Sequence, residues 1–80
     1  MKVQVTVVPK AGVLDPQGKA ISGALARLGF AGVSEVRAGK VFRVEVAADC
    51  PEAAREAAAR MAEKLLANPV VEDFEVEVVG

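Results

Sequence analysis

The chain has 80 residues, of which 52% are hydrophobic, and a formal net charge of -1. This length fits one small domain, residues 1–80, and the lack of a basic excess argues against a nucleic-acid partner. A lone Cys50 leaves no partner for a disulfide within the chain, which favours a cytoplasmic protein. No apolar run approaches the roughly 18 residues that a membrane helix needs, so we expect a soluble protein.

The apolar residues of the chain are small. It contains 15 Ala and 15 Val but only three Phe, and neither Trp nor Tyr. Because a chain of this size buries only about 60% of the surface that its unfolded form exposes, its core will be thin. We therefore expect the protein to be stabilised by oligomerisation.

Residues 2–8 alternate apolar and polar side chains, which predicts a strand with one buried face formed by Val3, Val5 and Val7. A helix is expected from near Pro16. Its apolar stripe consists of Ile21, Ala24, Leu25 and Leu28. Gly29 is expected to end this helix, because glycine readily adopts the left-handed conformation of a helix C-terminus.

Two more strand-like runs, residues 33–37 and 41–47, flank the sequence Ala38-Gly39-Lys40. This arrangement predicts a hairpin with its turn at residues 38–40. The last predicted strand covers residues 73–79. The inward side chains of the strand at 41–47 are expected to be Phe42, Val44 and Val46. Those of the last strand are expected to be Phe74, Val76 and Val78.

A second helix is expected from about Pro51 to Ala67, with either Asp49 or Cys50 at its N-cap. The Asn68-Pro69 pair ends it, because the residue before a proline is disfavoured in a helix. The small-residue stripe of this helix consists of Ala54, Ala57, Ala58, Met61 and Leu65.

The order strand, helix, strand, strand, helix, strand is that of the α+β ferredoxin-like fold, βαββαβ. It predicts a four-stranded antiparallel sheet with two helices on one face. The other sheet face stays exposed in a single copy. We therefore expect a second copy to cover that face or to extend a sheet edge, so that the chain oligomerises through the sheet.

Residue types that carry catalysis are scarce. The chain has no His, the commonest general base and metal ligand, and its serines have no evident base. Cys50 at a helix start could be a reactive thiol, but a small, partly buried capping residue is the better interpretation. The acids are spread along the chain, and the segment from Glu72 to Glu77 is best interpreted as a solvated strand face. We predict no catalytic residue, no metal site and no cofactor-binding residue on this chain.

The segment PKAGVLDPQG, residues 9–18, has two interpretations. The N-terminus of the following helix could bind an anion through free backbone N–H groups. The segment lacks the spacing of a P-loop or of a dinucleotide-binding loop, however, and Asp15 occupies the place that an anion would take. The favoured interpretation is structural: Asp15 caps the helix, Pro16 begins it and Gly12 turns the chain.

Gly18 and Gly23 lie inside the first predicted helix, where each costs about 1 kcal/mol relative to Ala. We expect close packing against the sheet or a second subunit to compensate. An RNA-binding sheet would present aromatic side chains on its exposed face. The outward positions expected here are polar instead: Gln4, Thr6, Arg43 and Glu45.

Four motifs extend over nearly the whole chain: V-x-V-x-x-K-x-G-V-L-D-P-Q-G at residues 5–18, LG at 28–29, VRAGK at 36–40 and KLLANPVVEDFEVE at 64–77. Together they resemble PurS, the family of small subunits of phosphoribosylformylglycinamidine synthase. The resemblance implies a non-catalytic subunit of an ATP-dependent ligase of purine biosynthesis. In this family the large synthetase subunit holds the ATP and substrate sites, and a glutaminase subunit releases ammonia.

The resemblance further implies that the chain joins these two subunits, assists ammonia transfer and forms a homodimer or homotetramer. ATP and Mg are then used by the complex, with no cofactor on this chain. None of the motif residues is implied to be catalytic. Candidates for subunit contacts lie on the two loops of the motifs: Lys10, Gly12, Asp15, Gly18, Arg37, Gly39 and Lys40.

Two other classes share parts of this pattern. An ACT-like small-molecule regulatory domain has the same order of strands and helices, and it would be stabilised by its ligand. A nucleic-acid binder using the sheet face would show salt-dependent binding to single strands. An assembly subunit tested by itself should show neither stabilisation by a small ligand nor salt-dependent binding to single strands.

Overall fold

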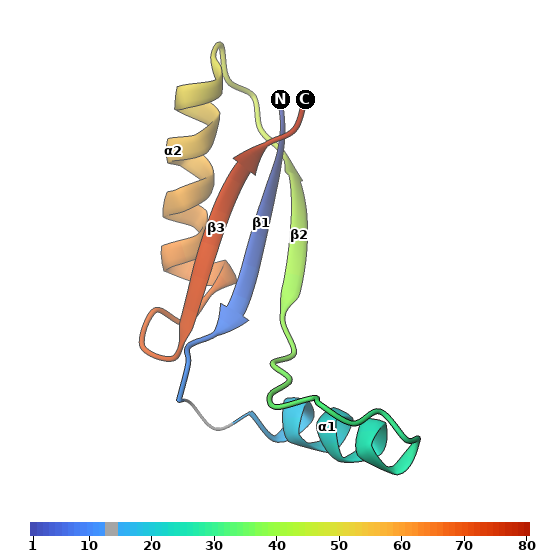
Figure 1. Ribbon diagram of the computed structural model, residues 1–80. Helices are drawn as coiled ribbons and strands as arrows, with labels where there is room; N and C mark the ends of the chain where they lie inside the picture. The colour runs from blue at the N-terminus through green and yellow to red at the C-terminus, as the bar shows by residue number, and fades with distance from the viewer. Residues whose placement is uncertain (13–14) are drawn as a thin grey trace.

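The computed structural model describes residues 1–12 and 15–80 (Figure 1). Its elements follow in the order β1 (Lys2–Pro9), α1 (Pro16–Arg27), β2 (Lys40–Glu45), α2 (Pro51–Met61), the π-helix η1 (Ala62–Leu66) and β3 (Glu72–Val78). The element types at both ends of the chain are those predicted. Over the described residues, no helix has the length and hydropathy needed to span a membrane.

The described strands form an antiparallel sheet in the order β2-β1-β3. Val5 lies opposite Phe42 on one side and Val76 on the other, which confirms the predicted inward faces of these strands. Gln4 lies opposite Arg43 and Glu77 on the other face, so that face is polar as predicted. The inward positions of the sheet are therefore set by the alternation of side chains along each strand.

The core lies between the inner face of the sheet and α2. Val3, Val5 and Val7 on β1 are fully buried, and their neighbours on the helix are Ala54, Ala58 and Ala62. Small side chains bring the helix close to the sheet, but they also limit the apolar area that the core removes from water. The thin core expected from the composition is confirmed.

The second helix changes its winding after Met61. The backbone N–H of Ala67 donates to the carbonyl oxygen of Ala62 at 2.9 Å, an i→i+5 bond that forms η1. This wider turn places Leu66 against the core and leaves Leu65 83% exposed. The prediction that Met61 and Leu65 belong to the buried stripe was therefore wrong, whereas Ala54 and Ala58 are buried as predicted.

The predicted four-stranded sheet and the hairpin at residues 38–40 are wrong. Residues 33–37, all within the described part, have no regular secondary structure and belong to no strand. Gly39 lies against the carbonyl oxygen of Val7, and Arg37 binds the carbonyl oxygen of Pro9. Residues 37–39 therefore continue past the end of β1 along the line of β2 instead of reversing direction.

The prediction that both helices cover one sheet face is also wrong. α2 covers the sheet, whereas α1 lies beyond its lower end, and residues 28–39 return beside α1 (Figure 1). The molecule measures 49 × 25 × 14 Å, with a radius of gyration of 15.7 Å. A compact domain of 80 residues would have a radius of about 12 Å.

Replacing Val5 tests the core. We expect Val5→Ala to lower the free energy of unfolding by about 1.5 to 3 kcal/mol, because it removes two buried carbons and leaves a cavity. Thr6→Ala on the polar face of the same strand is the matched control and should change stability by less than about 0.5 kcal/mol. Urea unfolding at a fixed protein concentration measures both; equal losses would contradict the assignment of the buried face.

Candidate functional site

The predicted contact residues gather where the sheet meets α1. We call this region the joint and define it as residues 9–12, 15–18 and 36–40. It contains all seven candidates: Lys10, Gly12, Asp15, Gly18, Arg37, Gly39 and Lys40. Two motifs that are separated by 17 residues in the sequence thus meet at one place in the fold. Whether they contact another subunit stays a prediction.

Asp15 links α1 to the returning chain. It occupies the N-cap position with Pro16 as the first helical residue, as predicted, but its side chain makes no capping hydrogen bond of good geometry. Its Oδ2 accepts a hydrogen bond from the backbone N–H of Ala38 at 2.8 Å. This bond is the largest of the effects that lower the pKa of the Asp15 carboxyl below its usual value. The backbone N–H groups of Gly18 and Gln17 lower this pKa further. Asp15 therefore connects two segments of the joint in addition to beginning the helix.

Gly18 and Gly39 allow two close backbone contacts. A Cβ on Gly18 would overlap the carbonyl oxygen of Val36 and lie 2.7 Å from Oδ2 of Asp15. A Cβ on Gly39 would lie 2.6 Å from the carbonyl oxygen of Val7. The close approach expected at Gly18 is confirmed, but its partner is the chain at Val36 and not the sheet. Gly23 has no such neighbour among the described residues.

The basic residues of the joint bind the sheet end. Nζ of Lys10 lies 2.9 Å from Oδ1 of Asp73, and Nη1 of Arg37 donates to the carbonyl oxygen of Pro9 at 3.1 Å. Nζ of Lys40 lies 4.0 Å from Oε2 of Glu72. These pairs are partly exposed and contribute little individually, about 0 to 1 kcal/mol. Glu72 and Asp73 were predicted as solvated acids, and no local sequence signal indicates these pairings, because Lys10 and Asp73 are 63 residues apart.

A groove of about 610 Å³ lies between α1 and residues 34–37. Its lining includes acidic, basic and hydroxyl side chains, among them Asp15, Lys19, Ser22, Ser34 and Arg37. The carboxylate of Asp15 lies near the N–H groups that an anion would need, which agrees with the structural interpretation of this loop.

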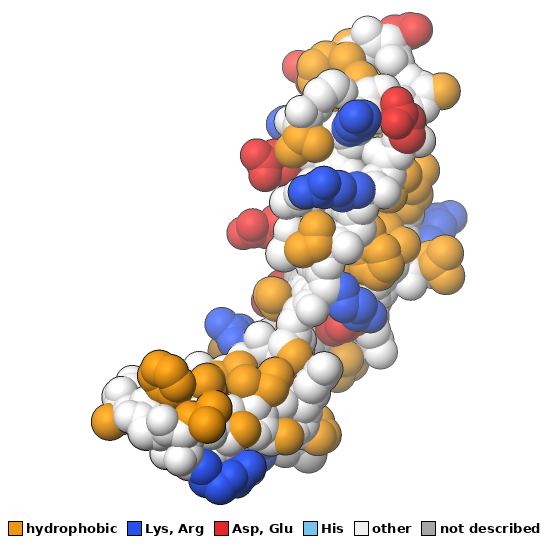
Figure 2. Space-filling model, turned by 90° about the vertical axis from the view of Figure 1, so that its right-hand side faces the viewer, with side chains coloured by type: hydrophobic (Ala, Val, Ile, Leu, Met, Phe, Trp, Pro, Cys, Tyr) orange, Lys and Arg blue, Asp and Glu red, His pale blue; other side chains and the backbone are white. Residues whose placement is uncertain are grey.

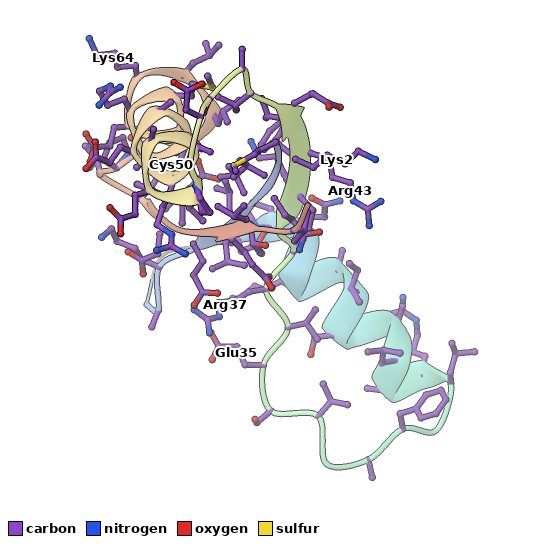
Figure 3. All side chains as sticks on the ribbon, turned by 90° about the horizontal axis from the view of Figure 1, so that it is seen from above. Lys2, Glu35, Arg37, Arg43, Cys50 and Lys64 are labelled. Atoms are coloured by element: carbon purple, nitrogen blue, oxygen red, sulfur yellow. The ribbon has the colours of Figure 1, made fainter. Side chains whose placement is uncertain are left out.

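The remaining reactive groups do not form a site in the described part of the chain. Cys50 is at the N-cap position of α2, with Pro51 following it as the first helical residue, but it is exposed and not partly buried as expected. No group of three or more His, Cys, Asp or Glu residues that could hold a metal occurs among the described residues. Lys2 and Arg43 extend from the sheet on the side away from α2, and Glu35 and Arg37 lie together on the returning chain (Figure 3).

Comparisons with known proteins match the chain over its full length. Residues 2–80 match the PurS family, described as phosphoribosylformylglycinamidine (FGAM) synthase. FGAM synthase subunit PurS of Mycobacterium leprae is 47% identical, covering 90% of this chain and 87% of the relative. The crystal structure of Methanocaldococcus jannaschii PurS, one of the subunits of formylglycinamide ribonucleotide amidotransferase in the purine biosynthetic pathway, has a TM-score of 0.80 at 39% identity and covers 95% and 92% of the two chains. The structure of PurLQS from Thermotoga maritima contains a chain with a TM-score of 0.85 at 36% identity, covering 98% and 95%.

Gly18→Ala should loosen the joint, because the added Cβ would collide with the carbonyl group of Val36. We expect faster amide exchange in the first turn of α1 and in residues 36–38. Gly23→Ala is the matched control in the same helix, since the nearest atom to its Cβ would be Nη1 of Arg27 at 3.6 Å. Equal exchange rates in the two variants would argue against the close contact.

The Asp15–Ala38 bond should weaken in acid. Because the pKa of Asp15 is lowered in the folded chain, its stabilisation is present at neutral pH and is lost as the pH falls below the usual value of 3.8. We expect the protection factor of the Ala38 amide, corrected for intrinsic exchange, to drop over that range. Asp15→Asn should remove this pH dependence, while Asp49→Asn, an exposed acid before α2, should leave it unchanged. Persistent dependence in Asp15→Asn would contradict the assignment.

Proposed function

Because the chain belongs to the PurS family of FGAM synthase subunits, we propose that it is the non-catalytic small subunit that bridges the large synthetase subunit and the glutaminase subunit of this enzyme in purine biosynthesis. The observation that carries this proposal is the full-length similarity to PurS chains, including one from the PurLQS structure. Such a similarity leaves little of the chain for a separate function.

The side chains support a role in assembly. The sequence has no His, and its single thiol, Cys50, is exposed at the start of α2. We assign the use of ATP, Mg and glutamine-derived ammonia to the other subunits, and to this chain the assistance of ammonia transfer between them. The complex would act in the cytoplasm.

A homodimer or homotetramer is part of the proposal. Apolar side chains gather over the lower part of the molecule, where α1 and residues 28–39 lie (Figure 2). Leu28 is 73% exposed and Phe30 59%. Exposure of this apolar area to water costs a free chain about 25 cal/mol of free energy for each Å². Association with a second copy would remove that area from water.

Reconstitution tests the proposal. We expect the large and glutaminase subunits, with ATP, Mg and glutamine present, to convert substrate efficiently only when this chain is added, and we expect all three to co-elute. When ammonia is supplied in place of glutamine, the rate of substrate conversion should depend less on the presence of this chain. Full glutamine-dependent activity without the chain, together with no co-elution, would overturn the proposal.

The joint supplies a variant for the same assay. Lys10→Glu with Lys40→Glu places like charges beside Asp73 and Glu72 and reverses the charge of two contact candidates. We expect weaker assembly and lower glutamine-dependent activity. Lys64→Glu in η1, outside the joint, is the matched charge reversal and should retain both. Circular dichroism checks that the variants remain folded; normal assembly of the double variant would remove the two lysines from the proposed contact.

A further inference from the structure

Two large apolar side chains at the end of the second helix lie almost fully in water. Leu65 in η1 is 83% exposed, and Val70 in the turn that follows, residues 68–71, is 80% exposed. Pro69, beside Val70 in that turn, is exposed as well. We call Leu65, Pro69 and Val70 the apolar knob. A single exposed apolar side chain is ordinary on a protein surface, whereas a group of them indicates a contact surface.

The exposure of Leu65 follows from the winding of η1. Leu65 comes 11 residues after Ala54 and 7 after Ala58, and both spacings are close to whole turns of a 3.6-residue α-helix. A continued α-helix would therefore return Leu65 to the face on which these alanines are buried. The i→i+5 bond between Ala67 and Ala62 widens the turn, and Leu65 stays in water. Such π turns are rare and frequently occur at functional sites.

The turn that carries Val70 satisfies its own backbone donors. The N–H of Asn68 donates to Oε1 of Glu72 at 2.8 Å, and the N–H of Val70 donates to Oδ1 of Asn68 at 3.1 Å. The N–H groups of Val71 and Glu72 both donate to the carbonyl oxygen of Asn68, at 3.1 and 2.7 Å. Pro69 has no N–H group. Every backbone donor from residue 68 to residue 72 is therefore bonded within the chain.

These internal bonds prepare the turn for burial. Water would satisfy the same donors in a turn that stays on the surface, so exposure alone does not require the bonds. A turn that enters an interface loses its water, and each unpaired donor then costs free energy. The internal bonds remove this cost. They also hold Val70 in one position before binding, which lowers the entropy lost on association.

The two acids that end the turn and begin β3 are already paired. Glu72 accepts the N–H of Asn68 and lies 4.0 Å from Nζ of Lys40. Oδ1 of Asp73 lies 2.9 Å from Nζ of Lys10. The apolar knob itself carries no charge. A partner that buries the knob therefore matches it best with an uncharged, apolar pocket.

A second copy of this chain does not offer such a pocket among the described residues. A protruding side chain needs a concave apolar site. The groove between α1 and residues 34–37, and a second hollow of about 420 Å³ beside Lys2 and Arg43, are both lined mainly by charged and polar side chains. The apolar area assigned above to association between copies lies on α1 and residues 28–39, whereas the knob lies at the end of α2 beside the start of β3 (Figure 1).

The knob adjoins the joint. The backbone N–H of Lys10 donates to the carbonyl oxygen of Val71 at 2.9 Å, directly after the knob in the chain. A partner that contacts the joint at Lys10 therefore also meets the turn at residues 68–71. Lys64 lies outside the knob, because adjacent residues of a helix do not face the same side, and it points away from α1 (Figure 3).

We infer that the apolar knob docks into an uncharged apolar pocket on another subunit of the enzyme, with the turn at residues 68–71 entering already formed. This inference deepens the bridging role and rests on the proposed function. Leu65 and Val70 are the anchors of the contact, because they lose the most water-exposed apolar surface when the pocket covers them.

Truncation of the two anchors tests the docking. We expect Val70→Ala and Leu65→Ala each to raise the dissociation constant of this chain for one of the other two subunits about ten- to fiftyfold, because they remove two or three buried carbons. Titration calorimetry with each purified subunit in turn, and with both together, measures the constants in the presence of ATP, Mg and glutamine. Val41→Ala, at an exposed valine on the outer face of β2, is the matched control and should leave them unchanged. Urea unfolding should show the same stability for all three variants.

The preformed turn has a test of its own. Asn68→Ala removes the acceptor of the Val70 N–H, so we expect faster exchange of the Val70 amide in the free chain and about two- to tenfold weaker binding to the same subunit. Asn68→Asp keeps Oδ1 as an acceptor and should restore both. Unchanged binding of Asn68→Ala in spite of faster exchange would contradict the inference that the turn enters the pocket already formed.

The outcomes separate this inference from the proposed function. Wild-type dissociation constants in both Val70→Ala and Leu65→Ala overturn the inference alone. A smaller homo-oligomer of these variants by light scattering, with binding to the other subunits unchanged, assigns the knob to a second copy and also overturns it. If the unmodified chain binds neither subunit, both proposals fall. Weaker binding of the variants, in an enzyme whose glutamine-dependent activity does not require this chain, overturns only the proposed function.

Discussion

The contact between the first turn of α1 and residues 36–38 determines the shape of this chain. Because Gly18 has no side chain, the carbonyl group of Val36 can approach the helix backbone. Beside this contact, Asp15 accepts a hydrogen bond from the backbone N–H of Ala38. With this contact formed, the chain passes the end of β1 and enters β2 without a hairpin reversal. α1 then lies beyond the sheet, and no other described strand pairs with the outer edge of β2.

The same contact explains why a single copy has a small core. Of the described helices, α1 lies off the sheet and α2 packs on it, with alanines of α2 against the valines of β1. The apolar residues of α1 and of the returning chain stay exposed, among them Leu28 and Phe30. The net stability of a protein is a small difference between large terms, so an uncovered apolar surface on this scale lowers the stability of a single copy.

Most of the local structure was predictable because it depends on neighbouring residues. The alternation in residues 2–8 determines which face of β1 is buried, and Pro16 and Pro51 mark where the helices begin. The candidate contact residues were identified as two motifs, and the structure brings them together in the joint. Their ion pairs with Glu72 and Asp73 were not predictable, because each joins residues more than 30 positions apart without a local pattern.

The wrong predictions concern residues whose local sequence pattern favours one structure while contacts with distant segments produce another. Residues 33–37 have a strand pattern and Ala38-Gly39-Lys40 has turn chemistry, so a hairpin was the natural expectation. The structure instead uses Gly39 for a close contact with Val7 and Ala38 as a donor to Asp15. The sequence by itself determined β1, β2 and β3 with their inward faces, the two helices and the family. Only the tertiary structure decided where α1 lies and which edge of the described sheet is unpaired, because those depend on contacts of Pro9, Asp15 and Gly18 with the segment at 36–40 that neither segment encodes alone.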